Sequence, residues 1–197
     1  MDPLAETLAK YLPAQGLVVD LASGSGERVI QLARTFGHLA WQPTERDPQK
    51  VAALVQARDA SGLNNVLRPI ELDVFLQPWP LAQADAIAAI DYAHLVSWDQ
   101  VTAAFGGGAR LLQSGGLFFL FGPFRFHGKY ASKQHEDLDL QLRSRDPNVG
   151  LRDIRELTVA GTRTGLGLEH AVATPAGAAL IFRRRPLLPP TGQFRIG

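Results

Sequence analysis

The stretch VVDLASGSGERVIQLA, residues 18–33, decides the fold. Its first residues are apolar and run into Asp20 and Leu21, as in a buried strand, and its second half carries apolar side chains at helical spacing. Between them lies a turn rich in Gly and Ser, which lets a ligand approach the backbone closely. A strand, a small-residue turn and a helix in this order predict the first unit of an α/β sheet with a ligand at the turn.

Length and composition favour one globular domain with no strongly charged partner. The chain has 197 residues, of which 46% are hydrophobic and 20% charged, with a net charge of +1 and no Cys. We therefore expect no nucleic-acid or membrane partner, no disulfide and no Cys metal site. No apolar run of the sequence reaches membrane-spanning length and no secretory leader is visible, so we expect a cytoplasmic protein of open oligomeric state.

Strand-like and helix-like segments alternate along the chain. After a short opening helix at 4–12, helical patterns lie between apolar runs; the helical patterns are at 27–36, 48–61 and 98–113, and the apolar runs at 17–21, 39–43, 66–72, 85–91 and 116–122. This order predicts a mostly parallel sheet with helices on both faces.

The C-terminal part breaks the alternation. LEHAVATPAGAALIFRRR, residues 168–185, holds two apolar runs around Pro175-Ala176-Gly177 and predicts an antiparallel hairpin. Residues 121–147 are predicted to form a long polar connection. We expect a single domain over 1–185 and a Pro-rich C-terminal tail over 186–197.

The small-residue turn lacks the residues that phosphate-binding turns need, and this bears on the ligand that we predict for it. Gly24 and Gly26 supply two positions of the dinucleotide fingerprint, but Val29 stands at the third, and no Gly-Lys-Ser/Thr follows. A carboxylate at Asp20 would repel a pyrophosphate and suits a cationic amino or sulfonium group. S-adenosylmethionine has both groups and no phosphate. The order acidic-x-small-x-Gly-x-Gly, which class I methyltransferases use for it, is formed here by Asp20, Ala22, Gly24 and Gly26, with Ser23 and Ser25 between them; the alternative is a turn that only joins strand and helix.

Further acidic residues end the next strands. Glu45, nineteen residues beyond Gly26, is placed to hold both ribose hydroxyls of an adenosine. Arg46 beside it would also suit a 2′-phosphate, but the missing third Gly counts against that. Asp73 and the neighbouring backbone at Val74 are placed to meet an adenine amino group. Each alone is compatible with a solvated charge at a strand end, but together they lie at the edge where open α/β sheets bind ligands.

The fourth strand leads into the candidate catalytic residues. Asp91 and Tyr92 stand at its carboxyl end, where we expect both to contact the cofactor. His94 follows at a position suited to a general base, with Asp91 orienting or charge-stabilising the ring. The alternative is a His94 that only hydrogen-bonds the backbone. His127 and His135 are not spaced with carboxylates as metal ligands are, so we predict no metal site.

The sequence resembles the group of methyltransferase-like protein 26, in the domain of unknown function 938 family of class I methyltransferases. The likeness runs from DPLAETL to LIFRR and includes SGSG, WQPTERDP, HLVSW, LLQSGGLFFLFGPF, LRSRDP and GLRD. The sequence departs from the group at Arg28 (usually His), Asp91 (usually Asn), Phe121 (usually Tyr) and Gln134-His135 (usually Ser-Asn).

This resemblance implies a Rossmann-like methyltransferase fold, a seven-stranded sheet whose last strand is antiparallel, with S-adenosyl-L-methionine as cofactor. The leading hypothesis is methyl transfer to an unidentified small-molecule acceptor. The alternatives are a protein that binds S-adenosylmethionine without transferring the methyl group, a related enzyme that does other chemistry on this cofactor and, last, a nucleotide-dependent oxidoreductase.

Overall fold

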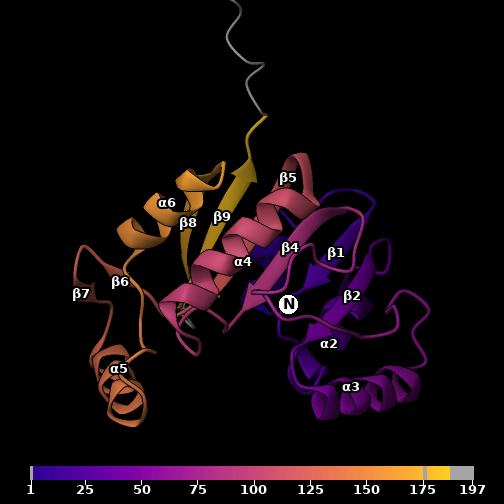
Figure 1. The fold of residues 1–197 in the computed structure, drawn as a ribbon, viewed down its shortest axis with the longest axis horizontal. Coiled ribbons are helices and arrows are strands. Elements are labelled where there is room, and N and C mark those ends of the chain that lie inside the picture. Colours follow the sequence, from indigo (N-terminus) through magenta and orange to yellow (C-terminus); the bar gives the residue numbers. More distant parts are fainter. Residues whose placement is uncertain (1, 175–176, 187–197) are drawn as a thin grey trace, which may run out of the picture.

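The computed structural model describes residues 2–174 and 177–186 and contains one seven-stranded sheet with the order β3-β2-β1-β4-β5-β9-β8 (Figure 1). Strands β1 to β5 are parallel, whereas β9 runs antiparallel to both β5 and β8. The mostly parallel sheet with an antiparallel last strand is thus confirmed. Its strands are β1 (Leu17–Asp20), β2 (Ala40–Glu45), β3 (Ile70–Glu71), β4 (Ala84–Ile90), β5 (Leu112–Gly122), β8 (Leu166–Thr174) and β9 (Gly177–Arg184).

Helices cover both faces of the sheet, and β5 shows how. Phe118 and Leu120 of β5 belong to a core with α4 and α6, while Leu117 and Phe119 belong to a second core with α1 and α2. Alternate residues of one buried strand therefore serve opposite faces. The helices are α1 (Pro3–Leu8), α2 (Glu27–Thr35), α3 (Pro48–Ser61), α4 (Trp98–Leu111), α5 (Lys133–Arg145) and α6 (Ile154–Arg163). No helix among the described residues is both long and apolar enough to span a bilayer.

Three predicted segments differ from the structure. The expected polar connection at 121–147 contains a small hairpin, β6 (Arg125–Phe126) with β7 (Lys129–Tyr130), and helix α5. The expected strand at 66–72 is reduced to β3, because Pro69, without an N–H, precedes it; Val66 forms only an isolated bridge to Trp41. The opening helix ends at Leu8 rather than Leu12.

The closing hairpin is confirmed in its two strands, β8 and β9. Its turn residues 175–176 lie outside the described residues, as does the predicted Pro-rich tail from 187 onward.

The run Gly106-Gly107-Gly108 in α4 gives a matched pair of substitutions. A Cβ on Gly108 would lie 2.5 Å from Cε2 of Phe118 and 3.0 Å from Cδ1 of Ile87, whereas a Cβ on Gly106 meets only the Arg110 side chain, at 3.7 Å. Gly106→Ala should raise the free energy of unfolding by about 0.5–1 kcal/mol through helix propensity. Gly108→Ala should lower it by about 1–3 kcal/mol through overpacking. Urea denaturation measures both, and equal shifts for the two variants would contradict this packing of α4 on the sheet.

Candidate functional site

The loop after β1 leaves open space at Gly24. Ala22, Gly24 and Gly26 have φ of 57°, 58° and 83°. A Cβ on Gly24 would meet nothing within 4 Å, whereas one on Gly26 would lie 2.7 Å from Cδ2 of Leu54. Gly26 is therefore needed for the close packing of α3, and Gly24 keeps a space free of protein atoms beside the loop.

The same loop is fastened to the neighbouring strand β2. The Ser23 amide donates to the Thr44 carbonyl at 2.8 Å, and the Thr44 amide donates to Oγ of Ser23 at 3.2 Å. The Thr44 hydroxyl donates to the Asp20 carbonyl at 2.9 Å, and the Ser23 hydroxyl donates to the same carbonyl at 3.1 Å. These bonds hold the loop in one conformation against the end of β2.

Glu45, the last residue of β2, brings its carboxylate to this loop. One oxygen, Oε2, accepts from the Gly24 amide at 3.1 Å, and the other, Oε1, accepts from the Arg46 amide at 2.9 Å. The residue is buried, with 8% of its surface exposed. Each carboxylate oxygen can accept a second hydrogen bond, so both oxygens of Glu45 can still accept one from a ligand hydroxyl.

A cavity of about 120 Å³ opens beside Glu45 at the carboxyl ends of the strands. Five of the residues singled out in the sequence line it: Ala22, Glu45, Arg46, Val74 and Tyr92. Sequence reasoning missed its other walls, Leu21, Leu72, Val96 and Gln100. Val96 lies just before the N-cap Ser97 of α4 and Gln100 lies in its first turn, and no pattern in the sequence connected either residue with the loop.

Two of the predicted residues have other contacts. The Asp73 carboxylate accepts from the Phe75 amide at 2.9 Å and pairs with Nε of Arg46 at 3.1 Å. Ser25 lines a different cavity of about 410 Å³, together with Ser23, Arg28 and the α1 N-cap Asp2.

Tyr92 contributes a neutral phenol to the cavity. Its hydroxyl donates to the Gln100 carbonyl at 3.3 Å. Burial, and then the charge of Asp73, raise the pKa of this phenol above its usual value, so it stays protonated at neutral pH.

Asp20 is buried at the end of β1, with 4% of its surface exposed. Burial raises the pKa of its carboxyl from 3.8 to about 7, and the charge of Glu45 acts in the same direction, against the Ser23 hydroxyl and the Arg28 guanidinium. Two acidic groups thus stand at the ends of adjacent strands, and one of them titrates near neutral pH.

His94 and Asp91 lie together under the end of β5. A Cβ placed on Gly122 would be 3.3 Å from Nδ1 of His94 and 3.6 Å from Oδ1 of Asp91. Nδ1 of His94 is buried and finds no hydrogen-bond partner among the described residues. Burial lowers the pKa of this imidazole, with Arg152 and His135 adding to the effect and Asp91 opposing it. His94 is therefore neutral at pH 7, the form in which an imidazole accepts a proton.

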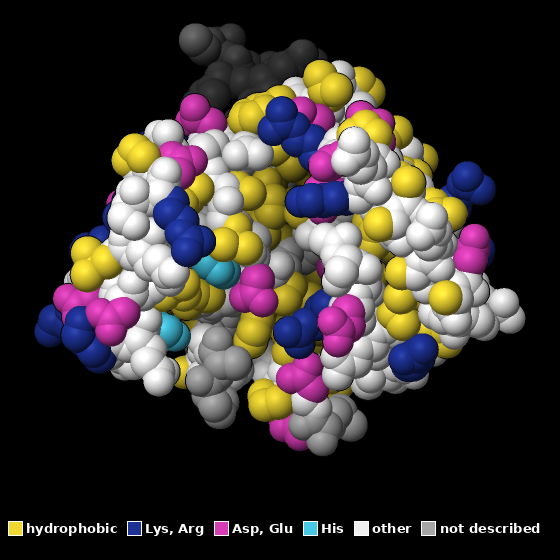
Figure 2. All heavy atoms as spheres, turned by 90° about the horizontal axis from the view of Figure 1, so that it is seen from below, with side chains coloured by type: hydrophobic (Ala, Val, Ile, Leu, Met, Phe, Trp, Pro, Cys, Tyr) yellow, Lys and Arg dark blue, Asp and Glu magenta, His cyan; other side chains and the backbone are white. Residues whose placement is uncertain are grey.

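His135 is a neighbour of His94 that sequence reasoning did not place here. It lies in the first turn of α5, and its buried Nδ1 also lacks a partner among the described residues. Because α5 was not predicted, nothing in the sequence indicated that His135 acts on His94. Figure 2 shows the lower face of the molecule, with a hollow near its middle that has apolar side chains inside and charged side chains around it, and with His side chains to one side.

Comparison with known proteins assigns a family and a fold. The model of the family described as "Protein of unknown function (DUF938)" matches residues 1–184, so the chain belongs to this family. Among solved structures, CalO1, described as a methyltransferase in calicheamicin biosynthesis in its SAH-bound form, is 21% identical with a TM-score of 0.74, over 91% of this chain and 52% of CalO1.

Two further structures have the same fold. Human N-acetylserotonin methyltransferase in complex with SAM is 14% identical with a TM-score of 0.78, over 94% of this chain and 52% of that chain. The YcgJ protein from Bacillus subtilis is 16% identical with a TM-score of 0.70, over 93% of this chain and 98% of that chain. The chain spans about half the length of CalO1 and of the human enzyme.

The buried Asp20 predicts a pH dependence of stability. Its folded pKa of about 7 lies above the ordinary 3.8, so between these values the folded state binds more protons than the unfolded state. The free energy of unfolding should therefore fall as pH rises from about 4 to about 7, with a slope of at most about 1.4 kcal/mol per pH unit from this group. Asp20→Asn should remove this component, which urea denaturation at several pH values measures. Parallel profiles for parent and variant would contradict the burial of an ionisable Asp20.

Proposed function

We propose that this member of the DUF938 family binds S-adenosyl-L-methionine and catalyses transfer of its methyl group to a small-molecule acceptor. The observation that carries the proposal is the space beside Gly24, bordered by the Glu45 carboxylate at the carboxyl end of β2. The fold supports it, since CalO1 was solved with SAH and the human N-acetylserotonin enzyme with SAM.

The residues around the cavity fit this cofactor. Glu45 is held by two backbone amides and keeps lone pairs for ribose hydroxyls. Val74 and Tyr92 supply apolar walls for an adenine ring, with Asp73 next to them for its amino group. Asp20 supplies a carboxyl that ionises readily beside a cationic group, because a nearby positive charge favours the charged form. Gly24 offers backbone without a side chain in the way.

The chemistry needs few side chains from the protein. S-adenosylmethionine, when bound, supplies an electrophilic methyl group on a sulfonium. The protein must then align the acceptor and, where the acceptor carries a proton, remove it. Neutral His94, with a free Nδ1, is the proposed base, and the Asp91 carboxylate stabilises the imidazolium that forms.

We place this activity in one domain over residues 1–185, and we assign the chain to the methyltransferase-like protein 26 group within the family. WQPTERDP supports the assignment: Trp41 is fully buried, the Gln42 amide donates to the Arg68 carbonyl at 2.8 Å, and Asp47 caps α3. GPF begins at Gly122, the last residue of β5, which lies beside His94, and Phe124 is buried. Residues of both motifs therefore have structural roles, and the elements that carry them border the proposed site.

Binding of S-adenosylhomocysteine tests the cofactor site, with a matched glycine as control. Gly24 and Gly62 have φ of 58° and 68°, and a Cβ on either meets nothing within 4 Å. Gly24→Asn should reduce the affinity for S-adenosylhomocysteine, measured by calorimetry, at least tenfold, which corresponds to about 1.4 kcal/mol or more. The reason is that the Asn side chain would enter the ligand space. Gly62→Asn carries the same backbone strain at the end of α3 and should bind as the parent does. Equal affinities of all three proteins, or no binding by the parent, would contradict the proposed site.

The role of His94 is tested by turnover with an acceptor that must lose a proton. His94→Gln should lower turnover by about 10²–10⁴-fold and leave affinity for S-adenosylhomocysteine nearly unchanged. In the parent, the rate should fall on acidification below pH 6.5, because the pKa of His94 lies below that value. This acid limb should be absent in the variant. A variant with normal turnover and the same acid limb would show that His94 only positions its loop.

A further inference from the structure

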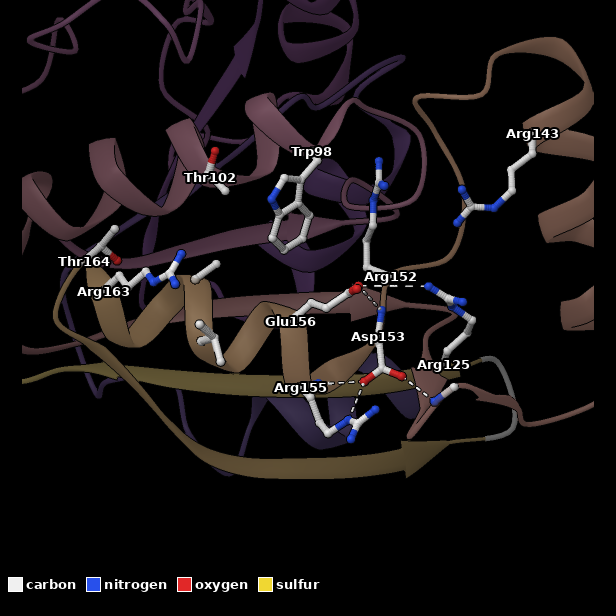
Figure 3. Close-up of a pocket in the computed structure, with 13 residues that line it drawn as sticks. Trp98, Thr102, Arg125, Arg143, Arg152, Asp153, Arg155, Glu156, Arg163 and Thr164 are labelled. Atoms are coloured by element: carbon white, nitrogen blue, oxygen red, sulfur yellow. Dashed lines mark hydrogen bonds and ion pairs between the residues drawn. The ribbon is translucent and has the colours of Figure 1, made fainter.

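A third and larger cleft lies between α4 and α6, with a volume of about 920 Å³. In Figure 3, Trp98 and Thr102 of α4 form one wall, Arg163 and Thr164 lie at one end, and Arg125 and Arg143 at the other. It is distinct from the cavity beside Glu45, because the two share no lining residue: Gln100 of α4 lines that cavity, whereas Trp98 and Thr102 of α4 line this cleft.

The cleft is strongly basic. Five arginines and two acidic residues, Asp153 and Glu156, line it. Three of the arginines are ion-paired: Arg155 with Asp153 at 3.5 Å, Arg125 with Glu156 at 4.0 Å and Arg143 with Asp139 of α5 at 3.0 Å. The two acids also have backbone partners. Asp153 caps α6 and accepts from the Gly128 and Arg155 amides at 2.5 and 2.9 Å, and Glu156 accepts from the Asp153 amide at 3.3 Å. Among the described residues, Arg152 and Arg163 are the cleft arginines without a carboxylate partner, and they carry the surplus of positive charge.

Arg152 places a buried charge in this wall without a carboxylate. Its guanidinium donates to the backbone carbonyls of Ala93 at 3.1 Å, Val96 at 2.6 Å and Asn148 at 2.7 Å, and lies 5.9 Å from the Trp98 ring centroid. The residue is only 8% exposed, and among the described residues it forms no ion pair. Neutral carbonyls accept its hydrogen bonds, and Glu156 and Asp139 act on its charge only without direct pairing, so part of its positive field reaches into the cleft.

Arg163 is the most available cation of the cleft. It is exposed at the end of α6, and within residues 2–174 and 177–186 it has neither a hydrogen-bond acceptor nor a carboxylate partner. In Figure 3 its guanidinium extends from α6 toward α4. Val159, half exposed one turn earlier on α6, and the Trp98 ring give the cleft apolar surface between its charged ends.

We propose that the cleft between α4 and α6 is a binding site for a small organic anion, with a phosphate or carboxylate group on the arginines and an apolar body against Trp98 and Val159. Guanidinium groups bind both anions with charge-assisted hydrogen bonds. The volume suits a small-molecule ligand. The inference goes beyond the proposed function, because it holds whether or not the anion takes part in methyl transfer.

Calorimetric titration of the full chain with phenyl phosphate tests this site. The parent should bind phenyl phosphate more tightly than inorganic phosphate, which lacks the apolar body. Arg163→Gln, which removes a cation, and Val159→Glu, which adds an anion to the wall, should each weaken binding about tenfold or more, equivalent to about 1.4 kcal/mol. Arg145→Gln is the matched control, since Arg145 is exposed on α5, outside the cleft, and should leave affinity unchanged.

The outcomes separate this site from the proposed cofactor site. Phenyl phosphate should bind Gly24→Asn as it binds the parent, and S-adenosylhomocysteine should bind Arg163→Gln and Val159→Glu as it binds the parent. No binding of phenyl phosphate to the parent, equal affinities for phenyl and inorganic phosphate, or equal losses in Arg163→Gln and Arg145→Gln would overturn the proposal.

Discussion

The hydrogen bond from the Gly24 amide to the Glu45 carboxylate joins the two halves of the proposed site. It links the loop after β1 to the last residue of β2, and the second oxygen of the same carboxylate accepts from the Arg46 amide. Burying a carboxylate is costly unless hydrogen bonds compensate for lost water, and these two amides provide part of that compensation. The bonds between Ser23 and Thr44 hold the same loop against the end of β2.

Much of the fold could be predicted because its elements follow simple rules. Helix α3 has the bounds predicted for it, 48–61, because Asp47 and Pro48 start it and Gly62 ends it. Helix α5 could not be predicted from hydrophobic periodicity. Its leucines stand two residues apart, at 138, 140 and 142, and its buried residue is Asp139, which accepts from Tyr130, Arg143 and Leu151. A helix that buries a hydrogen-bonded carboxylate instead of a row of apolar side chains shows no helical periodicity of hydrophobic residues.

The candidate site likewise contains residues that could be predicted from the sequence and residues that could not. Residues that end strands, Asp20 and Glu45 above all, could be predicted because parallel strands finish at one edge. The walls contributed by Val96 and Gln100, and the approach of His135 to His94, depend on how α4 and α5 pack, which spacing in the sequence does not encode. The arginine cleft could not be predicted for the same reason. Its basic residues are scattered along a chain of +1 net charge, and they come together only when β6, α5, the segment before α6 and α6 are assembled.

The central claim is that Glu45, held against Gly24, recognises the ribose of an adenosyl cofactor. A thermodynamic cycle tests it most directly, with the parent and Glu45→Gln each titrated with S-adenosylhomocysteine and with its 2′-deoxy analogue. Charge-assisted hydrogen bonds contribute about 1.5–3 kcal/mol, so Glu45→Gln should weaken S-adenosylhomocysteine by about tenfold to a hundredfold. The loss should be much smaller for the 2′-deoxy analogue. Equal losses for the two ligands would contradict the claim, because Glu45 would then not read the hydroxyl that distinguishes them.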